Sequence, residues 1–225
     1  LKKIINLKML EAKTIVKICG ITSVDQALKI AKLGVDAIGV ISVKESPRFV
    51  SLNRKKDIFR SLKKNFPNIK RVSVVKNIPL ELIRINSFDF ENVIQLHGDE
   101  DLSYCRRLRR ELPHIEIWKA FRIKDKEDTR EVELFSDFID AVLLDSWNEK
   151  TYGGSGVRIK STYLEALKFS KPWILAGGIS IDWLKQILTD IKPDGIDVSS
   201  SIESFPGIKD LNKTKKLLNL IKGIR

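Results

Sequence analysis

Short apolar segments alternate with amphipathic segments along almost the whole chain, and this alternation constrains the fold more than any other feature. Eight runs are typical of buried strands, and each is followed by a segment with the 3.6-residue period of a helix. The predicted strands cover residues 15–19, 36–42, 70–75, 92–96, 115–120, 139–144, 172–176 and 195–198. The predicted helices cover residues 23–33, 51–65, 79–87, 100–111, 126–135, 158–169, 180–190 and 210–222.

The predicted strands are apolar on both faces, as expected when helices cover one side of a sheet and a packed interior lies on the other. Eight strand–helix units within 225 residues predict an α/β protein formed by a single (β/α)8 barrel, the TIM barrel. A doubly wound open sheet uses the same alternation but rarely needs eight equal units. Residues 13–225 then form one barrel domain. Residues 1–12 precede it, either as a disordered extension or as a short cap.

The formal net charge of +12 raises the question of a polyanionic partner. The basic residues are spread along the chain and interleaved with acids, and the densest cluster, residues 106–110, has helical spacing that indicates a solvated helix face. A basic field also attracts a small anionic substrate. We therefore expect a small-molecule substrate rather than nucleic acid.

Hydropathy and cysteine content bear on the location of the protein. No apolar run approaches the roughly 20 residues needed to cross a bilayer, and the first residues are too broken for a secretory signal. Two cysteines, Cys19 and Cys105, are too few for a disulfide framework, which favours the reducing cytoplasm. We therefore expect a cytoplasmic protein without a membrane partner, and the sequence leaves a monomer and a homodimer both open.

The end of the first strand carries a cysteine. In barrels of parallel strands, the carboxyl ends meet on the face that carries the chemistry. Cys19 lies there beside Gly20, which leaves room for a ligand. A cysteine is most often a small buried hydrophobe, but a thiol at this rim can act as a base or nucleophile if its surroundings favour the thiolate. Cys105 lies in a helical pattern and is predicted to be structural.

The end of the sixth strand carries an aspartate, Asp145, whose carboxyl group can hold or deliver a proton. The alternative is a cap on the next helix, although a long loop comes first. The first and sixth strands lie three places apart around a ring of eight, so Cys19 and Asp145 are predicted to face each other across the barrel mouth. The loop after Asp145 holds Gly154 in a glycine-rich run, flexible enough to close over a substrate.

Glycines and serines follow the seventh and eighth strands. Gly177 and Gly178 come after the seventh strand, and Ser199 and Ser200 come after the eighth. These two loops are where barrels commonly bind phosphate. Glycine allows the backbone to approach a ligand closely, and backbone N–H groups can hold an anion. The two loops therefore predict a phosphate site.

Three other polar residues near strand ends are candidates for the site. Arg48 follows the second strand behind Pro47, where its guanidinium could bind a planar carboxylate or simply lie on the surface. Asp197 lies within the eighth strand, where it either orients rim groups or satisfies an interior layer. His97 is predicted to be a hydrogen-bonding rim residue rather than the principal base. With two histidines and two cysteines, the chain shows no metal-ligand cluster.

Taken together, these segments resemble the phosphoribosylanthranilate isomerases of tryptophan biosynthesis. The resemblance extends from about Val16 to Asp210 and keeps the motifs in order. The matching segments are residues 17–22 (KICGIT), 46–51 (SPRFVS), 95–98 (QLHG), 144–146 (LDS), 152–156 (YGGSG), 175–179 (LAGGI), 195–200 (GIDVSS) and 203–210. Any one motif is unspecific, whereas all of them in order are highly specific.

The resemblance implies an isomerase that needs no cofactor. Its reaction is the Amadori rearrangement of N-(5-phosphoribosyl)anthranilate to 1-(2-carboxyphenylamino)-1-deoxyribulose 5-phosphate. In that family the residue matching Asp145 is the general acid, and the residue matching Cys19 is the general base. Arg48 matches the arginine that holds the anthranilate carboxylate, and the glycine and serine loops match the phosphate cradle.

Other functions are compatible with a phosphate-binding barrel. A sugar-phosphate epimerase needs metal ligands that this rim lacks, and an indole-glycerol-phosphate synthase relies on lysine chemistry at strand ends. A non-enzymatic, basic nucleic-acid-binding barrel would bind DNA or RNA with a steep salt dependence. Such a protein need not keep both Cys19 and Asp145.

Overall fold

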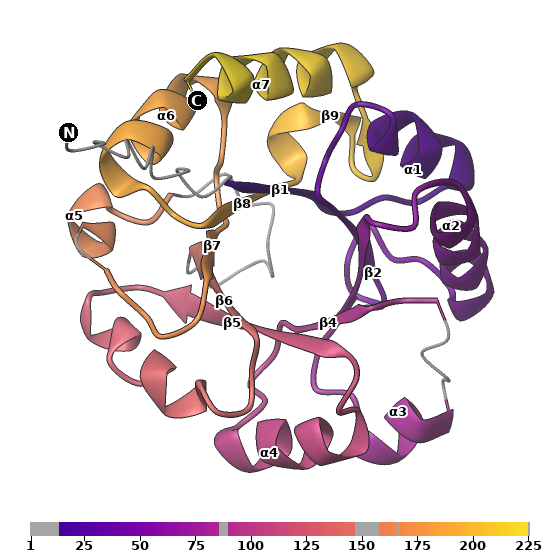
Figure 1. Cartoon of the computed structure of the whole chain (residues 1–225), viewed down its shortest axis with the longest axis vertical. Coiled ribbons are helices and arrows are strands. Elements are labelled where there is room, and N and C mark those ends of the chain that lie inside the picture. Colours follow the sequence, from indigo (N-terminus) through magenta and orange to yellow (C-terminus); the bar gives the residue numbers. More distant parts are fainter. Residues whose placement is uncertain (1–13, 86–89, 147–157, 166, 225) are drawn as a thin grey trace, which may run out of the picture.

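The computed structural model describes residues 14–85, 90–146, 158–165 and 167–224, so the predicted extension at residues 1–12 lies outside the described residues. Eight parallel strands close into a barrel, and helices surround it (Figure 1). The strands are β1 (Ile15–Ile18), β2 (Ala37–Ile41), β3 (Lys70–Val75), β4 (Val93–Leu96), β5 (Glu116–Ile123), β6 (Ala141–Ser146), β7 (Trp173–Leu175) and β8 (Gly195–Val198). The predicted (β/α)8 barrel is confirmed.

The barrel closes where the first strand pairs with the last. Lys17 of β1 lies opposite Ala37 of β2 on one side and opposite Asp197 of β8 on the other. This register fixes the two polar side chains of neighbouring strands at the same height in the barrel.

Helices surround the barrel, and side chains cap the start of some of them. The helices are α1 (Val24–Ala31), α2 (Leu52–Asn65), α3 (Leu80–Ile85), α4 (Leu102–Glu111), α5 (Ser161–Leu164), α6 (Ile181–Gln186) and α7 (Leu211–Ile224). The Ser23 hydroxyl accepts a hydrogen bond from the N–H of Gln26 at the start of α1, and the Asp101 carboxylate accepts one from Tyr104 at the start of α4. In the described part of the chain, no helix has the length and apolarity to span a membrane.

The predicted helix at residues 126–135 is wrong, because this segment forms two 3₁₀ turns, Glu127–Thr129 and Val132–Phe135. Asp128 accepts hydrogen bonds from the backbone N–H groups of Lys124 and Asp125, and the Asp125 carboxylate accepts one from Glu127. Such local side-chain bonds offer the backbone an alternative to the helix.

One other predicted helix is shorter than expected, and another changes its type along its length. Among the described residues of the range 158–169, only Ser161–Leu164 is helical, and Glu165 is already extended. Within residues 180–190, α6 continues as a π-helix, Ile187–Ile191. This helix ends at Lys192, which precedes Pro193 and has a left-handed φ of 52°, an uncommon conformation for a residue other than glycine.

The buried apolar residues form two layers. The larger layer lies between the strands and the helices, and it includes Cys105 and Leu108 of α4, as predicted for a structural cysteine. The smaller layer fills the barrel interior with residues such as Val72, Trp118 and Leu143. Arg106, Arg107 and Arg110 of α4 face solvent, which confirms the solvated helix face.

The connection between β8 and α7 contains a small hairpin that the sequence did not predict. It consists of β9 (Glu203–Phe205) and β10 (Ile208–Lys209), which pair antiparallel. Gly207 turns the chain with a φ of 82°, a left-handed conformation that glycine adopts at little steric cost. The hairpin places Glu203 and Lys209 beside the carboxyl end of β8, where they contribute to the site described next.

Candidate active site

Alternation along the strands brings polar side chains into the barrel mouth. Residues two apart on a strand share a face, so Cys19 lies above Lys17 and His97 lies above Gln95. By the same rule Asp145 lies above Leu143, which belongs to the interior layer. The structure places Asp145 inside β6, one residue before its end, rather than just past it.

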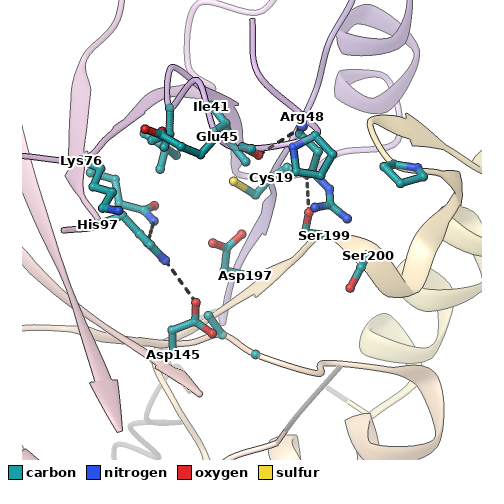
Figure 2. A pocket seen from close by; sticks show the side chains of 18 of the residues that line it. Cys19, Ile41, Glu45, Arg48, Lys76, His97, Asp145, Asp197, Ser199 and Ser200 are labelled. Carbon is teal, nitrogen blue, oxygen red and sulfur yellow. Dashed lines mark hydrogen bonds and ion pairs between the residues drawn. The ribbon is translucent and has the colours of Figure 1, made fainter. Parts of the chain in front are cut away.

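These side chains line one cavity with a volume of about 410 Å³ (Figure 2). The predicted site residues on its wall are Cys19, Arg48, Asp145, Gly177, Gly178, Asp197, Ser199 and Ser200. Figure 2 shows Cys19 and Asp145 on different sides of the cavity, with Asp197 between them. The predicted opposition of thiol and carboxyl group across the mouth agrees with this arrangement. Gly154 lies outside the described residues.

A missing side chain on β2 makes room for the Cys19 thiol. A Cβ atom built on Gly39 would lie 2.7 Å from Cys19 Sγ and 3.1 Å from Lys17 Cε. Burial raises the pKa of Cys19, and the nearby Lys17 ammonium opposes that rise. The thiol is therefore predominantly neutral at pH 7 in this structure, and the charge of Lys17 favours its ionisation.

Lys17 and Asp197 form a buried ion pair below the thiol. Lys17 is fully buried, and its Nζ lies 2.5 Å from Asp197 Oδ2. Burial acts against the charge of Lys17, but Asp197 and Cys19 together outweigh it and raise the pKa of the amine. The other oxygen of Asp197, Oδ1, is buried without a hydrogen-bond partner among the described residues. A buried unpaired acceptor beside a cavity is suited to a donor on a ligand.

We expect Gly39→Ala to lower kcat, because the added methyl group would displace the Cys19 thiol. Overpacking of this kind costs about 1–3 kcal/mol of stability, so activity should be measured per folded molecule. Gly223→Ala is the matched control, because nothing lies within 4 Å of its Cβ position in α7. It should leave kcat unchanged and raise the melting temperature. Equal kcat values in both variants would show that Gly39 does not position the thiol.

Asp145 is held from two directions. Its Oδ1 accepts a hydrogen bond of 2.8 Å from the N–H of Ser146, and its Oδ2 lies 3.2 Å from Nε2 of His97. The Nδ1 atom of His97 in turn lies 3.0 Å from the amide nitrogen of Gln95. His97 is thus a hydrogen-bonding rim residue, as predicted. Gly177, with a φ of 78°, lets its loop pack against Asp145, since a Cβ there would lie 2.8 Å from Oδ1.

Arg48 is engaged within the protein by a carboxylate that the sequence did not single out. Its Nε and Nη2 atoms donate to Glu203 at 2.9 and 2.7 Å. Gly20 makes this approach possible, because a Cβ there would lie 2.6 Å from Arg48 Cδ and 3.2 Å from Ser199 Oγ. The Arg48 guanidinium therefore lies buried beside the loop after β8.

The loops after β7 and β8 form another part of the cavity wall. Gly178 has a φ of 61°, and Ser199 donates a hydrogen bond from its hydroxyl to the carbonyl of Cys19 at 3.2 Å. Ser200 begins a 3₁₀ turn, Ser200–Ile202. Among the residues that the structure describes, no group of three His, Cys, Asp or Glu side chains could hold a metal ion.

Several residues that shape this site were not predicted from the sequence. Lys17 and Gln95 could have been found, because each stands two positions before a candidate residue and breaks an otherwise apolar strand. Nothing in the sequence singles out Gly39, because it makes room for the Cys19 thiol of the neighbouring strand. Glu203 and Lys209 act through a hairpin that periodicity does not indicate.

The fold and the cavity together define an enzyme of the (β/α)8 barrel class, with a thiol and a carboxyl group facing one site. The family model for N-(5'-phosphoribosyl)anthranilate (PRA) isomerase matches residues 16–220. The chain belongs to this family. Its membership sets aside the sugar-phosphate epimerase and the indole-glycerol-phosphate synthase.

Individual relatives agree with the family model. N-(5'-phosphoribosyl)anthranilate isomerase of Synechococcus elongatus is 39% identical over 204 residues, which cover 91% of this chain and 94% of that protein. The solved phosphoribosyl anthranilate isomerase of Thermotoga maritima is 28% identical with a TM-score of 0.81, covering 93% of this chain and 99% of that one.

A third comparison is with a solved isomerase in complex with reduced 1-(o-carboxyphenylamino)-1-deoxyribulose 5-phosphate. It is 27% identical with a TM-score of 0.76, and covers 93% of this chain and 99% of that chain.

Proposed function

We propose that this chain isomerises N-(5'-phosphoribosyl)anthranilate to 1-(2-carboxyphenylamino)-1-deoxyribulose 5-phosphate in tryptophan biosynthesis, by general acid–base catalysis without a cofactor. Membership of the isomerase family supports the reaction. The observation that carries the mechanism is the cavity that Cys19 and Asp145 both line. The direct test mixes purified protein with the substrate and follows the loss of the fluorescence of the anthranilate adduct.

The first proton transfer is assigned to Asp145. The carboxylic acid protonates the furanose ring oxygen, which breaks the bond to C1′ and opens the sugar to a protonated Schiff base. The contacts from Ser146 and His97 support this role, because they hold the carboxyl group in a fixed orientation towards the cavity.

The second proton transfer is assigned to Cys19. The thiolate removes the proton from C2′, the electron pair neutralises the Schiff base, and an enolamine forms. Tautomerisation of the enolamine then gives the ketone product. The nearby Lys17 ammonium supports the role of Cys19, because it stabilises the thiolate. Asp197 supports binding of the sugar, since its unpaired Oδ1 can accept a hydrogen bond from a hydroxyl group.

Two anionic ends of the substrate need partners in the cavity. Arg48 is assigned to the anthranilate carboxylate, and the loops with Gly177, Gly178, Ser199 and Ser200 are assigned to the phosphate. All five residues line the cavity. We further assign Gly154, which follows β6 in the sequence, to the substrate site on the strength of the sequence motif.

We expect Gly178→Val to raise the KM strongly, because a bulky side chain would intrude where the phosphate approaches. Inorganic phosphate should inhibit the wild type competitively and raise its melting temperature, since a ligand that binds only the folded state stabilises it. Gly34→Val is the matched control, because Gly34 has a comparable φ of 86° and nothing within 4 Å of its Cβ position.

Both valine variants carry backbone strain, but only Gly178→Val should lose the protection by phosphate. Equal protection of the two variants at matched ionic strength would remove Gly178 from the phosphate site.

The remaining expectations concern partners and location. We propose that the positive net charge of +12 serves a small anionic substrate rather than nucleic acid, and that the protein works in the cytoplasm. Two buried free cysteines support a reducing compartment. The oligomeric state of the chain is either a monomer or a homodimer, and the isomerase of Thermotoga maritima is a dimeric protein. Sedimentation equilibrium distinguishes the two states.

A further inference from the structure

Glu203 is the most heavily hydrogen-bonded carboxylate at the barrel mouth. It accepts Nε and Nη2 of Arg48, the N–H of Gly207 at 3.1 Å, and Nζ of Lys209 at 2.6 Å. Burial acts against its charge, but the Arg48 and Lys209 cations outweigh burial and lower the pKa of Glu203. The carboxylate is therefore ionised and held from three sides.

The geometry of the Arg48–Glu203 pair leaves part of the guanidinium available. An arginine has five N–H donors in a planar fork, and Glu203 uses one on Nε and one on Nη2. Both donors on Nη1 and the second donor on Nη2 stay unused by Glu203. Since Arg48 lines the cavity, these donors are suited to a second carboxylate from a ligand.

Glu203 also connects Arg48 to the loop after β8. Lys209 bonds to Glu203 and, through the same Nζ atom, to the carbonyl and hydroxyl oxygens of Ser199 at 3.1 and 3.2 Å. Burial lowers the pKa of Lys209, while Glu203 opposes this shift. A continuous chain of buried polar contacts thus runs from Arg48 through Glu203 and Lys209 to Ser199.

We propose that Glu203 is a positioning residue that fixes Arg48 for the substrate carboxylate and joins it, through Lys209, to the loop assigned to the phosphate. This inference rests on the proposed role of Arg48. The carboxylate end and the phosphate end of the substrate are then held by one rigid unit. Removing Glu203 frees Arg48 to take other conformations, so substrate binding weakens although no residue that contacts the reacting atoms has changed.

A double-mutant cycle between Glu203 and Arg48 tests the proposal. Glu203→Gln and Arg48→Ala should each raise the KM by about tenfold to a hundredfold, the range for a charge-assisted contact, with a much smaller change in kcat. The double variant should have a KM close to that of Arg48→Ala and well below the product of the two effects, because Glu203 acts mainly through Arg48. If the two effects on KM multiply instead, Glu203 does not act through Arg48 and the proposal is overturned.

The same cycle separates this inference from the proposed role of Arg48. An unchanged KM in Arg48→Ala contradicts the role of Arg48 itself. A raised KM in Arg48→Ala with an unchanged KM in Glu203→Gln contradicts only the inference about Glu203.

Loss of a buried ion pair also affects folding, and a second pair controls for this. Glu91 lies 2.7 Å from Lys55 and is equally buried, but neither residue lines the cavity. Glu91→Gln should lower the melting temperature and leave the KM unchanged. If Glu203→Gln does not fold, Glu203→Asp replaces it, since it keeps the charge but shortens the side chain. It should raise the KM as well, and a wild-type KM in a folded Glu203→Asp variant overturns the proposal.

Discussion

Cys19→Ser should lower kcat by at least about a hundredfold, because a serine hydroxyl ionises far above neutral pH and cannot replace the thiolate as a base. Binding of a product analogue should change little, since the thiol contributes mainly to the transition state. Single-turnover fluorescence and a binding titration measure the two quantities separately. Cys105→Ser is the matched control: this cysteine is equally buried but lies outside the cavity. It should cost stability and leave kcat unchanged.

The pH profile gives a second measurement of the same role. A general base acts in its deprotonated form, and burial raises the pKa of Cys19 above its ordinary value of 9.0. Below that pKa the thiolate fraction grows with pH, but a general acid must stay protonated in the same enzyme molecule, so kcat/KM does not report the thiolate alone. The rate at which iodoacetamide alkylates the folded protein does report it, and this rate should rise from neutral into alkaline solution. A thiolate of raised pKa is scarce at pH 7 but strongly basic, which partly offsets its low population. Cys105→Ser should keep the alkaline rise, and Cys19→Ser should lose it. Near-normal turnover in Cys19→Ser would remove Cys19 from the mechanism.

The barrel could be predicted from the sequence because its strands are covered on both sides and are therefore continuously apolar. β3 matches its predicted bounds, residues 70–75, and β8 matches residues 195–198. The prediction of a helix at residues 126–135 was wrong because aspartate side chains accept hydrogen bonds from nearby backbone N–H groups. The periodicity of apolar residues carries no information about such local bonds.

The candidate site was predictable where it depends on strand ends and not where it depends on contacts between strands. Cys19, Asp145 and Gly178 follow from the rule that parallel strands end on one face. The partner of Arg48 does not, because Glu203 lies 155 positions away on a hairpin. Gly39 matters only because β1 lies beside β2 in the closed barrel. Contacts of this kind are set by tertiary packing, so they appear only in the folded chain.

Asp145→Asn should abolish most of the turnover, because the amide keeps the volume of the side chain but is too weak an acid to deliver a proton to the ring oxygen. Losing a general acid typically lowers the rate by about a hundredfold to ten-thousandfold. The fold should persist, since the amide oxygen can still accept the hydrogen bond from the N–H of Ser146. Stopped-flow fluorescence with substrate measures the rate, and far-UV circular dichroism with thermal melting measures the fold.

Asp36→Asn separates loss of the acid from loss of a structural carboxylate. Asp36 accepts a hydrogen bond of 2.9 Å from the N–H of Val16, at the amino-terminal end of the strands and away from the cavity. This variant makes the same chemical change in a comparable backbone contact, so it should lose some stability and keep its kcat. The proposed acid requires the opposite pattern in Asp145→Asn: a melting temperature close to wild type with kcat collapsed. If Asp145→Asn instead unfolds like a structural variant and its folded fraction turns over normally, Asp145 is a cap on the following segment and another group opens the sugar ring.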